Sequence, residues 1–133
     1  MSAVAPFAAF LGLTLSLLAG AVATGLRARR RIHLTLVSCT VLSLAVTIFF
    51  AGRLGRLYDL EAAGWITPVH LSIARLCTAA YLLPFGTGLW TLRHPEGRPW
   101  HRRAAFFVVG LTVLTAATGT WMILASPERR PLP

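Results

Sequence analysis

Four long runs of apolar residues follow one another along the chain, separated by short polar connections. The runs predict helices at about 4–25, 33–51, 66–92 and 104–125, because a helix that rises about 1.5 Å per residue crosses the hydrocarbon of a bilayer with about 20 apolar residues. The second run is rich in β-branched residues, but only a helix satisfies its own backbone in lipid. We therefore expect one domain of the all-α integral membrane class, with four transmembrane helices in an up-down bundle.

The arginines predict how these helices are oriented. The connections after the first and third helices carry four arginines each, whereas the connection after the second balances Arg53 and Arg56 against Asp59 and Glu61. Positively charged connections stay on the cytoplasmic side. Both termini are therefore expected on the external (periplasmic) side of a bacterial cytoplasmic (inner) membrane. No positive charge precedes the first run, which favours a retained helix over a cleaved signal.

Composition agrees with a membrane protein. Of the 133 residues, 56% are hydrophobic and 13% are charged, and the mean hydropathy is +0.67. The net charge of +9 comes from arginine alone. Nucleic-acid binding needs a basic face on a soluble surface, so the partners expected here are the lipid bilayer and other membrane subunits, with no nucleic acid. Cys39 and Cys77 lie inside apolar runs and predict free thiols rather than a disulfide or a metal pair.

The four histidines are the candidate ligands for a metal or a haem. The predicted topology puts His33, His94 and His101 at the internal surface, where they could bind a metal or haem or contact lipid head groups. His70 enters the third helix from the external side, about 30 Å or more from His94. Met122 on the fourth helix shares the approximate depth of His70. A His70–Met122 haem is one interpretation, since His/Met ligation is known chemistry; ordinary packing of the methionine is the other.

One arginine lies inside a predicted span. Arg75 is about nine residues into the third helix, where a charge costs several kcal/mol unless it is paired, hydrated or able to reach the surface. Its partner could be a lipid phosphate, a carboxylate or propionate, or another subunit. Alternatively, it extends to Asp59 or Glu61 at the outer surface. Pro84 should bend or loosen the inner half of the same helix.

Small residues and surface arginines mark further contact positions. Gly20 on the first helix and Gly119 on the fourth belong to faces of small residues along which another helix can approach closely. We expect one face to be used inside the bundle and the other by a partner. Arg102 and Arg103, before the fourth helix, are expected to contact the membrane surface or a partner.

Several short segments together resemble a known family. They are Val69-His70-Leu71-Ser72-Ile73-Ala74, Gly86-Thr87-Gly88-Leu89 ahead of a basic turn, His101-Arg102-Arg103, and Thr118-Gly119-Thr120-Trp121-Met122-Ile123-Leu124. In these segments the chain resembles the CtaM/YozB-like family of small bacterial membrane proteins, over roughly its last half. The first half is similar only in hydropathy, and at the second helix His33 follows the basic residues instead of preceding them. The resemblance implies four transmembrane helices and a link to respiratory haem-copper oxidase, with His70 and His101 as functional positions.

Two classes of function follow from these patterns. The first is association with a haem-copper oxidase, as an assembly factor that delivers haem or a metal such as copper, or as an accessory component. The second is a structural subunit, with or without a bound haem, of a respiratory or photosynthetic electron-transfer complex. A transporter fits less well, because no carboxylate lies inside a span. The sequence has no nucleophile–base pair, phosphate loop or paired carboxylates, so catalysis by this chain alone is not expected.

Overall fold

The elements of the described chain are all helical. The computed structural model describes residues 4–129. Its elements are α1 (Val4–Leu26), α2 (Arg30–Leu54), η1 (Glu61–Ala63), α3 (Ile66–Ala80), α4 (Leu82–Arg93), η2 (Pro95–Gly97) and α5 (Arg98–Ala125), where η marks a single 3-10 turn. Four helical segments within these residues are long and apolar enough to cross a membrane, namely Val4–Leu26, Arg30–Leu54, Ile66–Arg93 and Pro95–Ala125. The prediction of an all-α chain with four such helices is confirmed.

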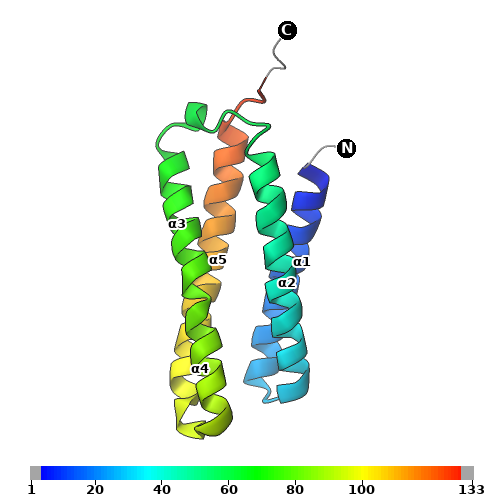
Figure 1. Cartoon of the computed structure of the whole chain (residues 1–133), viewed down its shortest axis with the longest axis vertical. Coiled ribbons are helices and arrows are strands. Elements are labelled where there is room, and N and C mark those ends of the chain that lie inside the picture. The colour runs from blue at the N-terminus through cyan, green and yellow to red at the C-terminus, as the bar shows by residue number, and fades with distance from the viewer. Residues whose placement is uncertain (1–3, 130–133) are drawn as a thin grey trace. The chain divides into compact units, whose positions relative to one another are not determined.

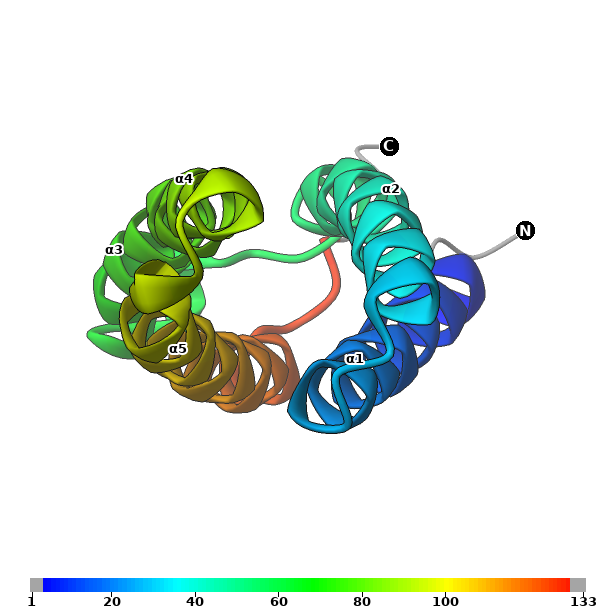
Figure 2. The same cartoon turned by 90° about the horizontal axis from the view of Figure 1, so that it is seen from below.

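The chain divides into two compact units, each of which is a helical hairpin. The first unit ends at Tyr58 and contains α1 and α2, which pack along each other. The second begins at Asp59 and contains α3, α4 and α5. In it, α3 and α4 follow one another along the side of α5 (Figures 1 and 2). We call these units the first and the second hairpin.

The turn of the first hairpin is tight and basic. Ala28 has a φ of 55°, in the left-handed region, and its N–H donates to Gly25 O at 3.2 Å. The next N–H, of Arg29, donates to Thr24 O at 3.0 Å. These two bonds satisfy the last carbonyls of α1 in an arrangement that usually has glycine at the left-handed position. The exposed arginines of residues 27–31 are thereby gathered at one end of this hairpin.

Buried hydroxyl groups contact one another across the interface of the first hairpin. Thr14 Oγ1 lies 2.8 Å from Ser43 Oγ and 3.0 Å from Thr47 Oγ1, and all three residues are buried. Large apolar side chains such as Leu42 and Phe49 are exposed instead, at 69% and 60%. Lipid provides no hydrophobic drive between helices, so close packing and interhelical hydrogen bonds are what join them in a membrane. This distribution suits a hairpin surrounded by lipid.

The second hairpin contains the helix interruption that Pro84 predicts. Proline has no N–H for the carbonyl of residue 80, and its ring crowds that carbonyl. The structure ends α3 at Ala80 and starts α4 at Leu82, with Tyr81 between them. The N–H groups of Tyr81 and Phe85 each reach their carbonyl acceptors at 3.3 Å, a long hydrogen bond. The loosening lies one turn before the proline.

The connection between α4 and α5 is compact because Gly97 packs against the ring of Trp90. A Cβ on Gly97 would stand 2.9 Å from Trp90 Cε3, so only glycine leaves room for that ring. Helix α5 then begins at Arg98, earlier than the predicted start at residue 104. Pro99 lies in its first turn, where a proline is tolerated because the N–H it lacks would have no helical partner. Arg102 and Arg103 are consequently exposed residues of α5 itself.

Candidate functional site

His70 packs against a glycine of the opposite helix. A Cβ on Gly119 would lie 2.8 Å from His70 Cε1, so the imidazole of α3 occupies space that only glycine leaves open on α5. His70 Nδ1 lies 3.0 Å from Thr118 Oγ1. The Thr118 hydroxyl has one proton, which it donates to Leu114 O at 2.8 Å, and it therefore accepts from His70 Nδ1–H. In the neutral imidazole this arrangement puts the lone pair on Nε2, the atom that would act as a ligand.

His101 repeats this arrangement at the other end of the second hairpin. A Cβ on Gly88 would lie 3.3 Å from His101 Cε1, so this imidazole of α5 also packs on a glycine, here of α4. Its Nδ1 lies 3.3 Å from Thr87 Oγ1, and the Thr87 hydroxyl donates to Leu83 O at 2.7 Å. By the same reasoning His101 Nδ1–H is the donor to Thr87. Gly88 and Gly119 thus have the same role on facing helices.

The remaining two histidines also place Nδ1 beside an oxygen atom. His33 Nδ1 lies 2.8 Å from Ala21 O across the first hairpin, and the ring packs on Gly25, where a Cβ would lie 3.1 Å from it. A carbonyl can only accept, so Nδ1 of His33 donates. The exposed His94 pairs with the Glu96 carboxylate at 3.1 Å. A hydrogen bond from Nδ1 to an oxygen is how histidine ligands of metals are usually oriented, but it orients a packed histidine equally well.

The structure brings together no metal-binding group within residues 4–129. No three His, Cys, Asp or Glu side chains of these residues form a group that could hold a metal ion. Of the predicted metal ligands, His33 belongs to the first hairpin, whereas His94 and His101 belong to the second. His70 contacts Gly119, which is 18 positions from His101 along α5, about 27 Å apart at 1.5 Å per residue. The four histidines therefore do not share one centre.

The predicted haem does not fit between His70 and Met122. Met122 is buried on α5, at 6% exposure, one turn beyond Gly119. The imidazole of His70 is already in contact with the backbone of α5 at Gly119. A porphyrin between the two side chains would have to occupy the space of this contact.

Arg75 is exposed on α3 and finds no partner in the described part of the chain. Neither Asp59 nor Glu61 pairs with it, since the ion pair found among residues 4–129 is that of His94 with Glu96. Arg102 and Arg103 are also exposed, and the guanidinium of Arg103 lies over the Trp100 ring, 5.3 Å from its centroid. The structure therefore does not show the alternative in which Arg75 extends to the acidic residues between α2 and α3.

Gly20 and Gly119 are both used inside their own hairpins. A Cβ on Gly20 would stand 3.3 Å from Leu36 Cδ1 of α2, and one on Gly119 would stand 2.8 Å from His70. We expected one of these two faces to remain for a partner, but each glycine packs against a helix of its own hairpin. A Cβ on Gly12, on the same helix as Gly20, would meet no heavy atom of residues 4–129 within 4 Å beyond the neighbouring backbone of its own helix.

Sequence reasoning missed the polar contacts at the centre of the second hairpin. Tyr81 Oη lies 2.9 Å from Thr112 Oγ1, and Cys77 Sγ lies 3.6 Å from the same oxygen. The Thr112 hydroxyl donates to Val108 O at 2.8 Å, so Tyr81 O–H donates to Thr112. The signal for such contacts is a stripe of hydroxyl residues at helical spacing, as in the buried set Thr40, Ser43 and Thr47 of α2.

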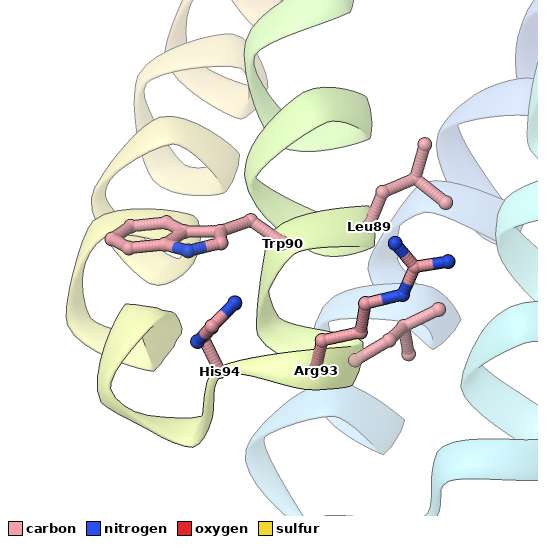
Figure 3. A pocket seen from close by; sticks show the side chains of 5 residues that line it. Leu89, Trp90, Arg93 and His94 are labelled. Atoms are coloured by element: carbon pink, nitrogen blue, oxygen red, sulfur yellow. The ribbon is translucent and has the colours of Figure 1, made fainter.

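A cavity of about 370 Å³ lies at the C-terminal end of α4. Its lining residues are Leu89, Trp90, Leu92, Arg93 and His94. Figure 3 shows Trp90 beside His94, whereas Arg93 extends on the other side of the helix end with Leu89. The two polar side chains do not point at a common position. This cavity therefore has a basic rim, but its polar groups do not converge on a ligand.

Comparisons with known proteins identify no relative of this chain. No family model, no curated protein and no solved structure matches it.

Proposed function

We propose that this chain is a multi-pass protein of the bacterial inner membrane that works bound to a respiratory haem-copper oxidase. The role is that of an assembly factor for haem or metal delivery, or of an accessory component. The four helices would cross the membrane as a bundle with both termini on the periplasmic side. The arginines at residues 27–31 and 93–103 support this orientation, since such connections stay in the cytoplasm.

The tryptophans of the second hairpin support its placement in a bilayer. Trp65 and Trp121 contact each other edge to face at one end, with ring centroids 5.3 Å apart, and Trp100 lies at the other end. Trp100 and Trp121 are 21 positions apart on the unbroken helix α5, about 31 Å at 1.5 Å per residue, which matches a hydrocarbon core of about 30 Å. Belts of tryptophan at both interfaces are typical of membrane proteins. Exposed hydroxyls on the spans also bond to their own helix, as in Ser38 to Leu34 O, Thr78 to Ala74 O and Thr120 to Ala116 O.

Arg75 is the observation that carries the proposal of a bound partner. It lies ten positions beyond Trp65, about 15 Å along α3. With the Trp65–Trp121 pair at the outer interface, that depth is about the middle of the hydrocarbon core. An exposed guanidinium without a partner among residues 4–129 costs several kcal/mol there. A carboxylate, propionate or carbonyl cluster of a larger membrane complex would remove this cost.

The identity of the partner as a haem-copper oxidase rests on the resemblance to the CtaM/YozB-like family. The residues that carry this resemblance lie in contact with one another, since His70 contacts both Thr118 and Gly119. His101 similarly contacts Gly88 and Thr87. Both sets of contacts join α5 to the helix opposite, which is α3 at His70 and α4 at His101. The alternative is that this chain is a structural subunit, with or without a bound haem, of a respiratory or photosynthetic electron-transfer complex, and Arg75 supports that role equally.

The test is co-purification of the oxidase with tagged chain from the membranes of the cells that produce it. Arg75→Leu should reduce the retained oxidase activity at least tenfold while leaving the amount of inserted chain unchanged. Arg56→Leu is the matched control, because it removes an exposed arginine outside the spans, and it should change retention less than twofold. Equal retention by both variants would contradict a role for Arg75 in partner binding.

A further inference from the structure

A groove in the second hairpin lies beside the basic connection, between α4 and α5. Its volume is about 330 Å³, at the lower end of the range of about 300–1,000 Å³ for ligand pockets. It is lined by Leu83, Thr87, Trp100, Arg103, Ala104 and Phe107. The lining residues of α5 extend from position 100 to position 107, about 10 Å along the helix axis. The groove therefore extends along about two turns of α5, and we call it the slot.

The walls of this slot are apolar although a threonine lines it. The Thr87 hydroxyl is engaged, because it donates to Leu83 O at 2.7 Å and accepts from His101 Nδ1 at 3.3 Å. Leu83, Phe107 and Trp100 are exposed side chains, at 50%, 52% and 58%. A slot of this kind on a lipid-facing surface is complementary to a hydrocarbon chain and offers little to a polar ligand.

A cation without a counter-ion among residues 4–129 lies at one end of the slot. Arg103 lines it, and its guanidinium lies over the Trp100 ring at 5.3 Å. The acidic residue of the basic connection, Glu96, is engaged with His94 at 3.1 Å. Arg98 and Arg102 are exposed nearby on α5 and add positive charge. A guanidinium at a membrane surface binds phosphate with two parallel hydrogen bonds.

Together, the slot and the arginine define a bipartite site. We propose that the second hairpin binds an anionic phospholipid, with its phosphate on Arg103 and part of one acyl chain in the slot. A headgroup that carries a positive charge beyond the phosphate would meet the other arginines of the same helix end, so a net negative headgroup is preferred. Basic pockets between transmembrane helices on the cytoplasmic side bind lipids in this way. The site is independent of Arg75 and of any oxidase.

Native mass spectrometry of the purified full chain, with no partner present, tests this proposal. The probes are phosphatidylglycerol and phosphatidylcholine of identical acyl chains, added at equal concentration in the same detergent. The chain should retain phosphatidylglycerol about tenfold more strongly. Arg103→Gln should reduce the retention of phosphatidylglycerol about tenfold, because a hydrogen-bonded pair with a charged group accounts for about that factor.

Two further variants separate the site from general surface charge. Arg98→Gln removes an equal charge from the same helix end without lining the slot, and it should reduce retention less than twofold. Ala104→Phe fills the slot while leaving every arginine in place, and it should reduce retention as much as Arg103→Gln does. Equal effects of the two arginine substitutions, or equal retention of the two lipids by the unmodified chain, would overturn the proposal. Because no oxidase is present, either result leaves the proposed association with that complex untouched.

Discussion

Replacing Gly119 by alanine would put a methyl group where His70 now lies. The new Cβ would stand 2.8 Å from His70 Cε1 and 3.3 Å from Nε2, so the ring must move. That movement also strains the bond of 3.0 Å from Nδ1 to Thr118. Overpacking costs about 1–3 kcal/mol, an interhelical hydrogen bond in a membrane averages about 0.6 kcal/mol, and the helix propensity of alanine returns up to about 1 kcal/mol. The free energy of unfolding should therefore fall by about 1–3 kcal/mol.

Gly110→Ala is the control on the same helix, because beyond the neighbouring backbone of that helix its Cβ would meet no heavy atom of the described chain within 4 Å. This variant should keep or slightly raise the free energy of unfolding, measured at equilibrium in bicelles by steric trapping. His70→Ala then removes the ring that Gly119→Ala would strike. In that background the cost of Gly119→Ala should disappear, which a double-mutant cycle measures. Equal effects at the two glycines, or a cost that persists without the imidazole, would refute the packing argument.

Two further predictions concern the hydroxyl contacts and the orientation. Thr112→Val removes the acceptor of the Tyr81 hydroxyl and should lower the free energy of unfolding by about 1 kcal/mol. Thr120→Val removes an exposed hydroxyl that bonds within its own helix and should cost less than half as much; equal losses would contradict the interhelical role. In a variant that lacks the exposed native Cys39, a cysteine introduced in place of Ala62 should react with an impermeant thiol reagent in intact cells. A cysteine introduced in place of Glu96 should react only after permeabilisation. The reverse labelling would contradict the proposed topology.

The four apolar helices could be predicted because each depends only on its own residues. A run of about 20 apolar residues either crosses a bilayer or does not, and no neighbouring helix changes that requirement. The interruption near Pro84 was predictable for the same reason, since the missing N–H is a property of one residue. The early start of α5 at Arg98 was not, because it depends on Gly97 fitting under Trp90 in the preceding turn.

The candidate site could not be predicted from the sequence to the same degree, because it depends on how helix faces pair. Hydropathy indicated the depth of His70 in the membrane and suggested Met122 as a second haem ligand at that depth. The actual neighbours of His70 are Thr118 and Gly119. Which residues meet depends on the rotation of two helices about their axes, and a nearly uniform apolar surface does not fix that rotation. That a histidine ring packs against a glycine of the facing helix can be recognised only in the three-dimensional structure.

One absorption spectrum would test whether this chain works bound to a haem-copper oxidase. Tagged chain would be purified in mild detergent from the membranes of its own cells, and the reduced-minus-oxidised absorption spectrum of the product recorded together with its oxidase activity. We expect the haem bands and activity of a haem-copper oxidase in the unmodified preparation, and their loss in the Arg75→Leu preparation at equal recovery of the chain. A preparation of the unmodified chain without haem bands and without oxidase activity would contradict it.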